Sequence, residues 1–146
     1  MKPGRIYCRG GGNGGSGYGG ATINTGNGSV TIVNATFSGN GATGGNGGTC
    51  GTTPGCPSCH DGPGSAGGGY GGALYNNSAK PLAVQNSIVA NSTSGGNANG
   101  TITDIGNNIS SDGTCNFTAS GSLNNTNPQF SGYANHGGLT YSRSKA

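Results

Sequence analysis

A five-residue segment recurs almost unchanged within this chain. Gly-Tyr-Gly-Gly-Ala occupies residues 17–21 and again residues 69–73, 52 positions later. Self-similarity at a long fixed interval is typical of repeat architectures, in which one supersecondary unit stacks on the next. The chain is therefore expected to repeat a structural unit rather than to enclose one thick core.

The apolar residues after each copy follow the same interval. A shift of 52 positions superposes Val30 on Leu82 and Ile32 on Val84. Alternation of apolar and other residues with a period of two predicts short strands with one buried face. A third related unit occupies residues 101–105, and no stretch shows a sustained helical period. We therefore expect strands and essentially no helix.

The composition limits how those strands can pack. Glycine supplies 35 of the 146 residues, only nine residues are charged, and Leu, Ile, Val and Phe together number 18. A β-sandwich would need more inward-facing bulk than this. A β-solenoid buries only a thin apolar stripe per coil, and Asn34 over Asn86 would add a ladder of side-chain amides. We predict a single all-β solenoid domain over residues 1–146, with its turns in the Gly-Gly and Gly-Asn clusters.

Several repeats also resemble those of a known group. Residues 71–76, 86–91 and 100–103 are similar to the right-handed parallel β-helices of bacterial and archaeal surface proteins. These include the polymorphic outer-membrane-protein-type repeats and the choice-of-anchor proteins. The resemblance covers most of residues 17–140 and implies a right-handed parallel β-helix. It implies little about function, because such β-helices serve as adhesins, passengers and scaffolds.

An insertion over residues 41–68 separates the two clear repeats and carries a motif of its own. Residues 56–60 read Cys-Pro-Ser-Cys-His, the C-x-x-C-H pattern of covalent haem c attachment. Cys56 and Cys59 would form thioethers to the porphyrin, and His60 would bind the iron as its proximal ligand. We therefore expect one haem c per chain.

The other axial position of the iron has one clear candidate. The chain contains only two histidines, and the second is His136. His136 replaces the Asn usual before Gly-Gly in the resembling repeats, and it would ligate the iron of its own or a neighbouring subunit. Bis-histidine ligation leaves no open position for oxygen or substrate, so we expect electron transfer rather than catalysis. Aromatic residues are expected to wall the porphyrin, namely Tyr70, Tyr75, Phe130 and Tyr133.

Two other interpretations of residues 56–60 remain open. A structural zinc site could combine Cys56 and Cys59 with Cys50 and His60, although adjacent Cys59 and His60 fit one tetrahedral ion poorly. A disulfide between Cys56 and Cys59, structural or redox-active, is the third interpretation.

The remaining cysteines are Cys8, Cys50 and Cys115. In the resembling β-helices a cysteine near Cys115 often pairs with one before the Gly-Thr-Ile-Thr segment, where this chain has Asn97 or Asn99. Cys115 is therefore expected either to pair with Cys50 or Cys8 or to remain free. The sequence does not choose among these pairings.

These observations predict a single-haem c-type cytochrome on a β-helix scaffold, acting in extracellular electron transfer. Solenoid ends polymerise unless capped, and no cap is evident in the sequence, so we expect self-association into a filament with a chain of haems. Expected partners are other copies, redox proteins or extracellular acceptors, and no nucleic acid. The alternative is a non-haem structural or adhesive surface β-helix protein.

Haem c maturation and disulfides both indicate a location outside the cytoplasm, at the cell surface or beyond. No apolar signal-peptide segment follows Met1, so this expectation rests on chemistry alone. No apolar run is long enough to span a bilayer, and we expect a protein that does not cross the membrane.

Overall fold

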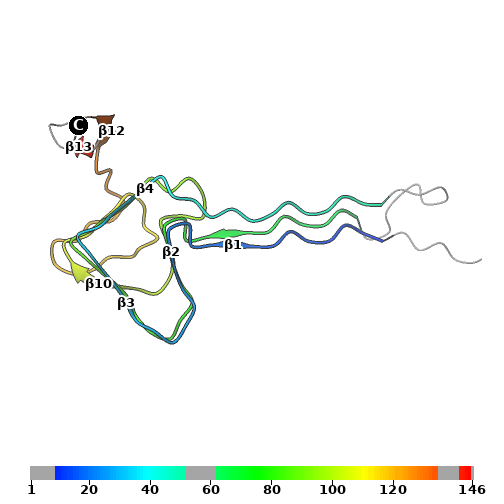
Figure 1. Cartoon of the computed structure of the whole chain (residues 1–146), viewed down its shortest axis with the longest axis horizontal. Coiled ribbons are helices and arrows are strands. Elements are labelled where there is room, and N and C mark those ends of the chain that lie inside the picture. Colours follow the sequence, from blue (N-terminus) through cyan, green and yellow to red (C-terminus); the bar gives the residue numbers. More distant parts are fainter. Residues whose placement is uncertain (1–8, 52–61, 135–141, 146) are drawn as a thin grey trace, which may run out of the picture.

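The chain folds into a body of short strands and a narrow stalk that projects from it (Figure 1). The computed structural model describes residues 9–51, 62–134 and 142–145. Within these residues the regular structure is entirely strand, which confirms the expected all-β class. The strands are β1 (Gly17–Tyr18), β2 (Thr22–Asn24), β3 (Val30–Val33), β4 (Thr36–Ser38), β5 (Gly69–Tyr70), β6 (Leu74–Asn76), β7 (Leu82–Gln85), β8 (Ile88–Ala90), β9 (Ala98–Gly100), β10 (Ile102–Gly106), β11 (Ile109–Ser110), β12 (Phe130–Ala134) and β13 (Ser142–Lys145).

The body is a stack of three layers, each formed by one pass of the chain. We call residues 17–40 layer 1, residues 69–94 layer 2 and residues 97–111 layer 3. Each strand pairs in parallel with its counterpart in the next layer, giving the sheets β1-β5, β2-β6-β9, β3-β7-β10 and β4-β8-β11. Layer 2 is therefore the middle of the stack.

The register between layers 1 and 2 is the interval seen in the sequence. Val30 pairs with Leu82 and Ile32 with Val84, and Gly17 pairs with Gly69. The predicted superposition of the repeats is confirmed, because each of these pairs is 52 positions apart.

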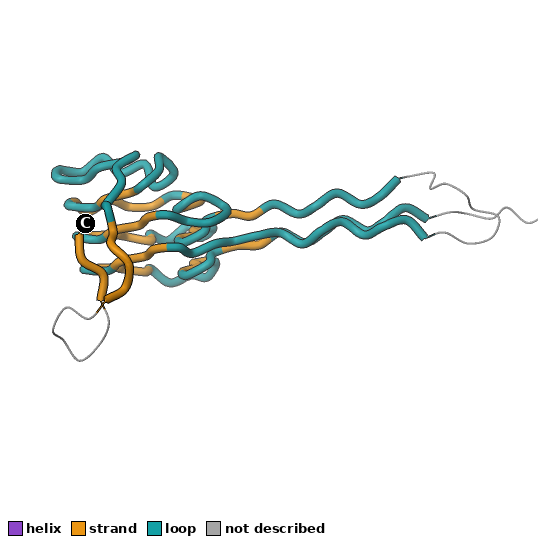
Figure 2. Tube along the Cα trace, turned by 90° about the horizontal axis from the view of Figure 1, so that it is seen from above, coloured by secondary structure: helices purple, strands orange, loops and turns teal. Residues whose placement is uncertain are grey.

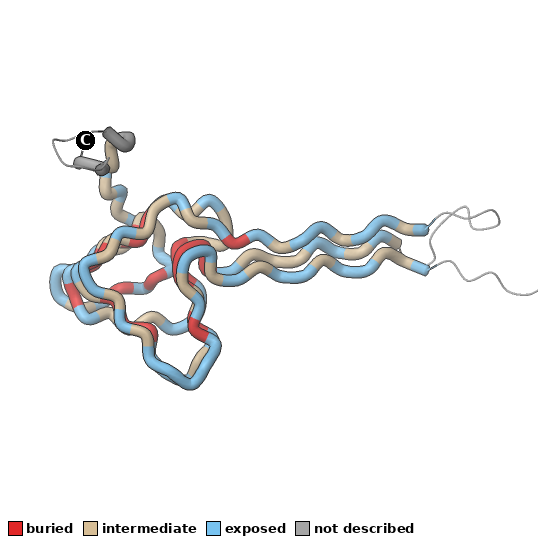
Figure 3. Tube along the Cα trace, viewed as in Figure 1, coloured by how far each residue is buried: buried red, intermediate tan, exposed pale blue. Residues whose placement is uncertain are grey.

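The core is thin and lies inside the stack (Figure 3). Its buried apolar side chains come from layers 2 and 3 and from the segment that follows, while layer 1 adds partly buried residues. Those fully or almost fully buried are Ala73, Leu74, Leu82, Val84, Val89, Ala98, Cys115 and Phe117, with Val30, Ile32, Phe37 and Ile102 packed against them. A few large side chains suffice because each layer contributes only one or two per sheet.

Asparagines form the corner between the third and fourth strands of each layer. Asn34, Asn86 and Asn107 all adopt positive φ, at 55°, 47° and 57°. Asparagine is among the few non-glycine residues that enter this region readily. The sharp bend therefore recurs in every layer without glycine.

A segment that follows layer 3 covers its outer side. Residues 112–126, which we call the cap, run along layer 3 and hydrogen-bond to it, as from the Ser110 N–H to the Leu123 carbonyl (2.8 Å). The Asp104 carboxylate accepts the N–H groups of Thr118 (2.7 Å) and Ala119 (2.6 Å). The expectation that the stack carries no cap is thus wrong at this end, because the cap depends on hydrogen bonds between distant residues.

The glycine-rich segments expected to form turns instead form the stalk. Residues 9–16, 43–51 and 62–68 run side by side away from the body (Figure 2). The body's remaining element is the antiparallel pair β12 and β13, in which Phe130 pairs with Lys145. This pair lies at the end of the molecule opposite the stalk (Figure 1).

Candidate functional site

The residues predicted to hold haem lie outside the described residues. These are Cys56, Cys59, His60 and His136. The structure does describe the positions that flank them. Gly51 and Gly62 stand at the free end of the stalk, whereas Ala134 and Ser142 belong to the strand pair at the opposite end (Figure 1). The two predicted halves of the iron site are therefore attached to opposite ends of the molecule.

The stalk consists of three extended chains joined by a regular set of backbone hydrogen bonds. The donors lie three residues apart on every chain, the spacing of a polyproline II helix. Residues 9–16 run parallel to residues 62–68, and residues 43–51 run antiparallel to both. The bonds are Gly11 N to Gly62 O (3.1 Å), Gly14 N to Ser65 O (2.8 Å), Gly45 N to Gly15 O (2.8 Å), Gly48 N to Gly12 O (2.7 Å), Gly64 N to Gly48 O (3.0 Å) and Gly67 N to Gly45 O (2.9 Å).

Glycine is required at the positions that face the stalk axis. A Cβ added to Gly11 would overlap the Gly48 carbonyl, and one added to Gly14 would overlap the Gly45 carbonyl. The same holds for Gly44, Gly47, Gly64 and Gly67, each against the backbone of a neighbouring chain. Intervening positions are different, because a Cβ on Gly12 or Gly15 would meet nothing within 4 Å. The chains therefore pack backbone to backbone, as glycine at every third position allows in collagen.

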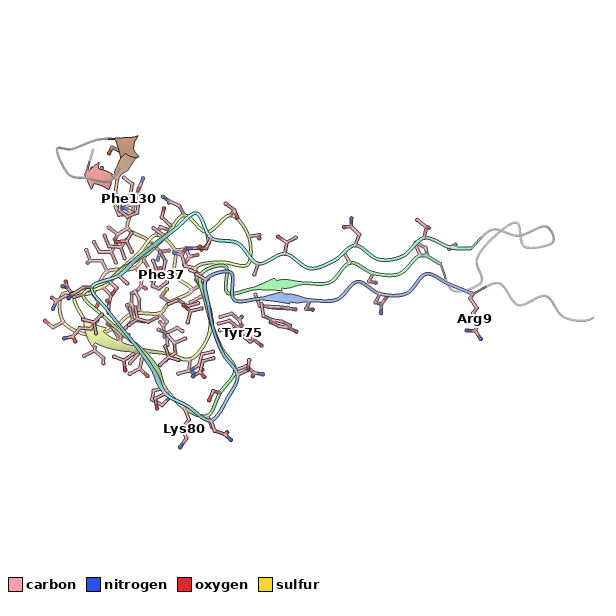
Figure 4. All side chains as sticks on the ribbon, in the orientation of Figure 1. Arg9, Phe37, Tyr75, Lys80 and Phe130 are labelled. Carbon is pink, nitrogen blue, oxygen red and sulfur yellow. The ribbon has the colours of Figure 1, made fainter. Side chains whose placement is uncertain are left out.

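Close packing leaves no room inside the stalk for a cofactor. Its outward side chains are few and neutral along most of its length (Figure 4). One of them, Asn13, accepts the Ser65 N–H through Oδ1 (2.9 Å) and so ties two of the chains together. The described stalk supplies extension and rigidity rather than a binding cavity.

The tyrosines expected near haem cluster where the stalk joins the body. The Tyr18 ring lies 5.4 Å from that of Tyr70 and 4.7 Å from that of Tyr75, measured between centroids. Figure 4 shows Tyr75 at this junction, Arg9 at the free end of the stalk, and Phe130 near the opposite end of the molecule. The structure therefore does not bring these aromatic residues together around the stalk tip.

The two described cysteines are in different states. Cys50, near the stalk tip, is disulfide-bonded. Cys115 is a free thiol with 2% of its surface exposed. Burial raises the pKa of Cys115 to about 12, and the nearby Asp112 and Asp104 carboxylates act in the same direction. The sequence left open whether Cys115 is paired, and the structure shows it unpaired and protonated at neutral pH.

Two aspartates that sequence reasoning did not single out hold the cap in place. Burial opposes the ionisation of Asp104, but hydrogen bonds from the Ala119 N–H, Asn108, Ser122 and Gly106 outweigh it and hold its pKa below the usual value. Asp112 has a lowered pKa for the same reasons, with Thr114 and the Asn97 N–H as its main donors. Both carboxylates act as structural acceptors.

A shallow groove of about 520 Å³ runs across the asparagine corners. It is lined by amides and by small or apolar side chains: Asn34, Ala35, Thr36, Asn86, Ser87, Ile88, Asn107 and Ile109. None of these lining side chains titrates, so the groove offers hydrogen bonds without an acid or a base.

Metal and membrane features were sought in the same part of the chain. Among the described residues, no cluster of three or more His, Cys, Asp or Glu side chains could hold a metal ion. None of the elements within those ranges is a helix long and apolar enough to cross a membrane.

A comparison of the chain with protein families, with curated proteins and with solved structures found no match. The site must therefore be interpreted from its own geometry.

Proposed function

We propose that the three-layer stack is a right-handed parallel β-helix. The repeated parallel register at an interval of 52 residues, the asparagine corners and the thin core support this architecture, as does the resemblance of residues 71–76 and 86–91 to surface β-helices. The stalk is then an elaboration of one turn of that helix, formed jointly by the insertion and residues 9–16.

We infer that the protein is a structural or adhesive surface protein that holds residues 52–61 away from its body. The observation that carries this proposal is the stalk itself. Glycines fixed at every third position and hydrogen bonds between all three chains make a rod with one purpose evident from its geometry, to separate its tip from the body. At 3.1 Å per residue, eight residues extend about 25 Å.

The location proposed for this protein is outside the cytoplasm. The disulfide at Cys50 supports it, because such bonds persist in oxidising compartments. The low charge and the many backbone-to-backbone bonds suit a protein that acts through its shape rather than through chemistry.

Small-angle X-ray scattering in solution tests the display proposal. The expected particle is elongated, with a maximum dimension that exceeds that of the body by roughly the 25 Å of the stalk. A compact particle of the body's dimensions alone would contradict it.

A single-haem c-type cytochrome remains the second candidate, on the strength of the motif Cys56-Pro57-Ser58-Cys59-His60. The flanks of this motif stand at an exposed tip, so a porphyrin would not need to enter a packed interior. Two peptide units span only about 7 Å, which keeps His136 near Ala134 at the far end of the molecule. This geometry supports ligation by His136 of a neighbouring subunit, in a head-to-tail filament that conducts electrons along its haems.

Absorption spectroscopy separates the two candidates. A Soret band and a covalently added haem mass, in protein exported from a host that matures c-type cytochromes, support the cytochrome. Colourless protein of unmodified mass from that host rules it out and leaves the display proposal. If haem is present, His136→Ala is expected to abolish the low-spin spectrum and the filament together, and an unchanged spectrum would assign the sixth ligand elsewhere.

A further inference from the structure

The disulfide at Cys50 has a partner outside the described residues. Cys115 is excluded because it is a free thiol. The chain has five cysteines, so the candidates are Cys8, Cys56 and Cys59. The first of these directly precedes the described Arg9, and the other two belong to residues 52–61.

The stalk's own periodicity distinguishes between these candidates. The glycines that face its axis form levels to which each chain contributes one residue: Gly14 with Gly44 and Gly67, then Gly11 with Gly47 and Gly64. One step of three residues toward the tip gives positions 8, 50 and 61. Two of the three residues at this next level are cysteines, and both fall on the register that faces the axis.

We propose that Cys50 is bonded to Cys8, closing the free end of the stalk. Residues 9–16 and 43–51 are joined by N–H to carbonyl bonds of 2.8 Å at Gly45 and 2.7 Å at Gly48. Chains joined in this way lie about 5 Å apart. A disulfide requires a Cα separation of about 4.4–6.8 Å, so the spacing between these two chains suits the bond.

The same register explains why cysteines follow the last glycines. Inside the stalk an axial side chain would collide with a neighbouring backbone. At the end of the stalk the next level is open on its outer side, and two axial side chains can share the space as one covalent link. Formation of the bond joins the two Sγ atoms and releases two protons and two electrons to a disulfide-type oxidant, which is reduced to two thiols.

This pairing goes beyond either proposed function and depends on neither. It fixes the chain at residue 8 to the stalk tip. It also leaves Cys56 and Cys59 unpaired with Cys50, and therefore free for haem, for each other or for a partner.

Tryptic mapping without reduction tests the pairing directly. Free thiols are first alkylated in denaturant, and trypsin then cleaves after Arg5 and Arg9. The released peptide 6–9 contains Cys8, while Cys50, Cys56 and Cys59 all remain in the fragment that begins at residue 10. Retention of peptide 6–9 on that fragment, with its release on reduction, is the first expected result. An unlinked, alkylated peptide 6–9 overturns the proposal.

Retention alone does not identify which cysteine is bonded to Cys8, so matched variants complete the test. Cys8→Ser is expected to make Cys50 alkylatable in denatured, unreduced protein, whereas Cys56→Ser and Cys59→Ser leave Cys50 protected. Alkylation of Cys50 in either of the latter two variants, but not in Cys8→Ser, assigns the bond to residues 52–61 and overturns the proposal. The readout is the mass of the peptide containing Cys50, which does not depend on haem or on any activity.

Discussion

Asn86 donates a hydrogen bond from its side-chain amide nitrogen to the Oδ1 of Asn34, at 2.5 Å, across two layers of the body. Both residues have positive φ, so each corner presents its amide outward, directly above or below the next. The backbone beside them is tied in the same direction, since the Ala35 N–H donates to Ser87 Oγ (3.0 Å) and the Ser87 N–H donates to Asn108 Oδ1 (2.9 Å). The corners are therefore joined both outside and inside the stack.

Replacing Asn86 separates the two contributions of this residue. Asn86→Ala loses the amide bond and places a Cβ-bearing residue without a local hydrogen bond at φ 47°, so we expect a loss of about 1–2 kcal/mol in the free energy of unfolding. Asn86→Gly loses only the amide bond, because glycine accepts positive φ, and should cost less. Chemical denaturation measures both, and equal losses would show that the backbone conformation is not strained.

Two neighbouring glycines provide a matched test of the stalk. Gly14→Ala places a Cβ against the Gly45 carbonyl, whereas Gly15→Ala places one in open space. We expect Gly14→Ala to increase amide hydrogen exchange by at least tenfold at Gly45, Gly48 and Gly67, and Gly15→Ala to leave it within a factor of two. The body should keep its exchange pattern in both variants. Similar exchange in the two variants would contradict the axial packing.

Acid is expected to loosen the cap. The pKa of Asp104 is lowered in the folded state, so its contribution to stability is fully present above the unfolded pKa of about 3.9 and is lost as the pH falls through the lower, folded value. Unfolding midpoints measured between pH 6 and pH 2 should therefore fall at the acid end. Asp104→Asn should reduce that dependence while retaining the contribution of Asp112, and an unchanged pH profile would show that Asp104 does not report on folding.

Cys115 should be inert while the protein is folded. Its thiol is buried and its pKa is raised to about 12, so both access and ionisation oppose alkylation at pH 8. We expect no iodoacetamide adduct at Cys115 in native protein and complete modification in denaturant, measured by intact and peptide mass. Modification at comparable rates in both conditions would place Cys115 outside the core.

The sequence predicts the body well, because its repeat is a direct record of stacking. Val30 over Leu82 and Asn34 over Asn86 follow from the 52-residue interval alone. The cap was missed for a physical reason. Asp104 meets the N–H groups of Thr118 and Ala119, and Phe117 closes the core, through contacts that no local pattern encodes.

The stalk was misinterpreted although a signal was present. Gly11, Gly14, Gly17 and Gly20 are three residues apart, as are Gly41, Gly44 and Gly47. Glycine clusters ordinarily mark turns, and the period of three acquires meaning only when three such chains can meet. Residues 56–60 and His136, on which the haem prediction rests, lie outside the described residues, so that prediction stays a prediction.

The cap gives the stack a direction. Layer 3 is covered by residues 112–126, whereas the outer edges of β1 to β4 in layer 1 have no strand partner within the described ranges. Two copies that met edge to edge through layer 1 would form a two-fold pair, and each would present a finished surface to any third copy. Association through the layers would thus stop at two, which makes the molecule's ends inherently unequal as sites of growth.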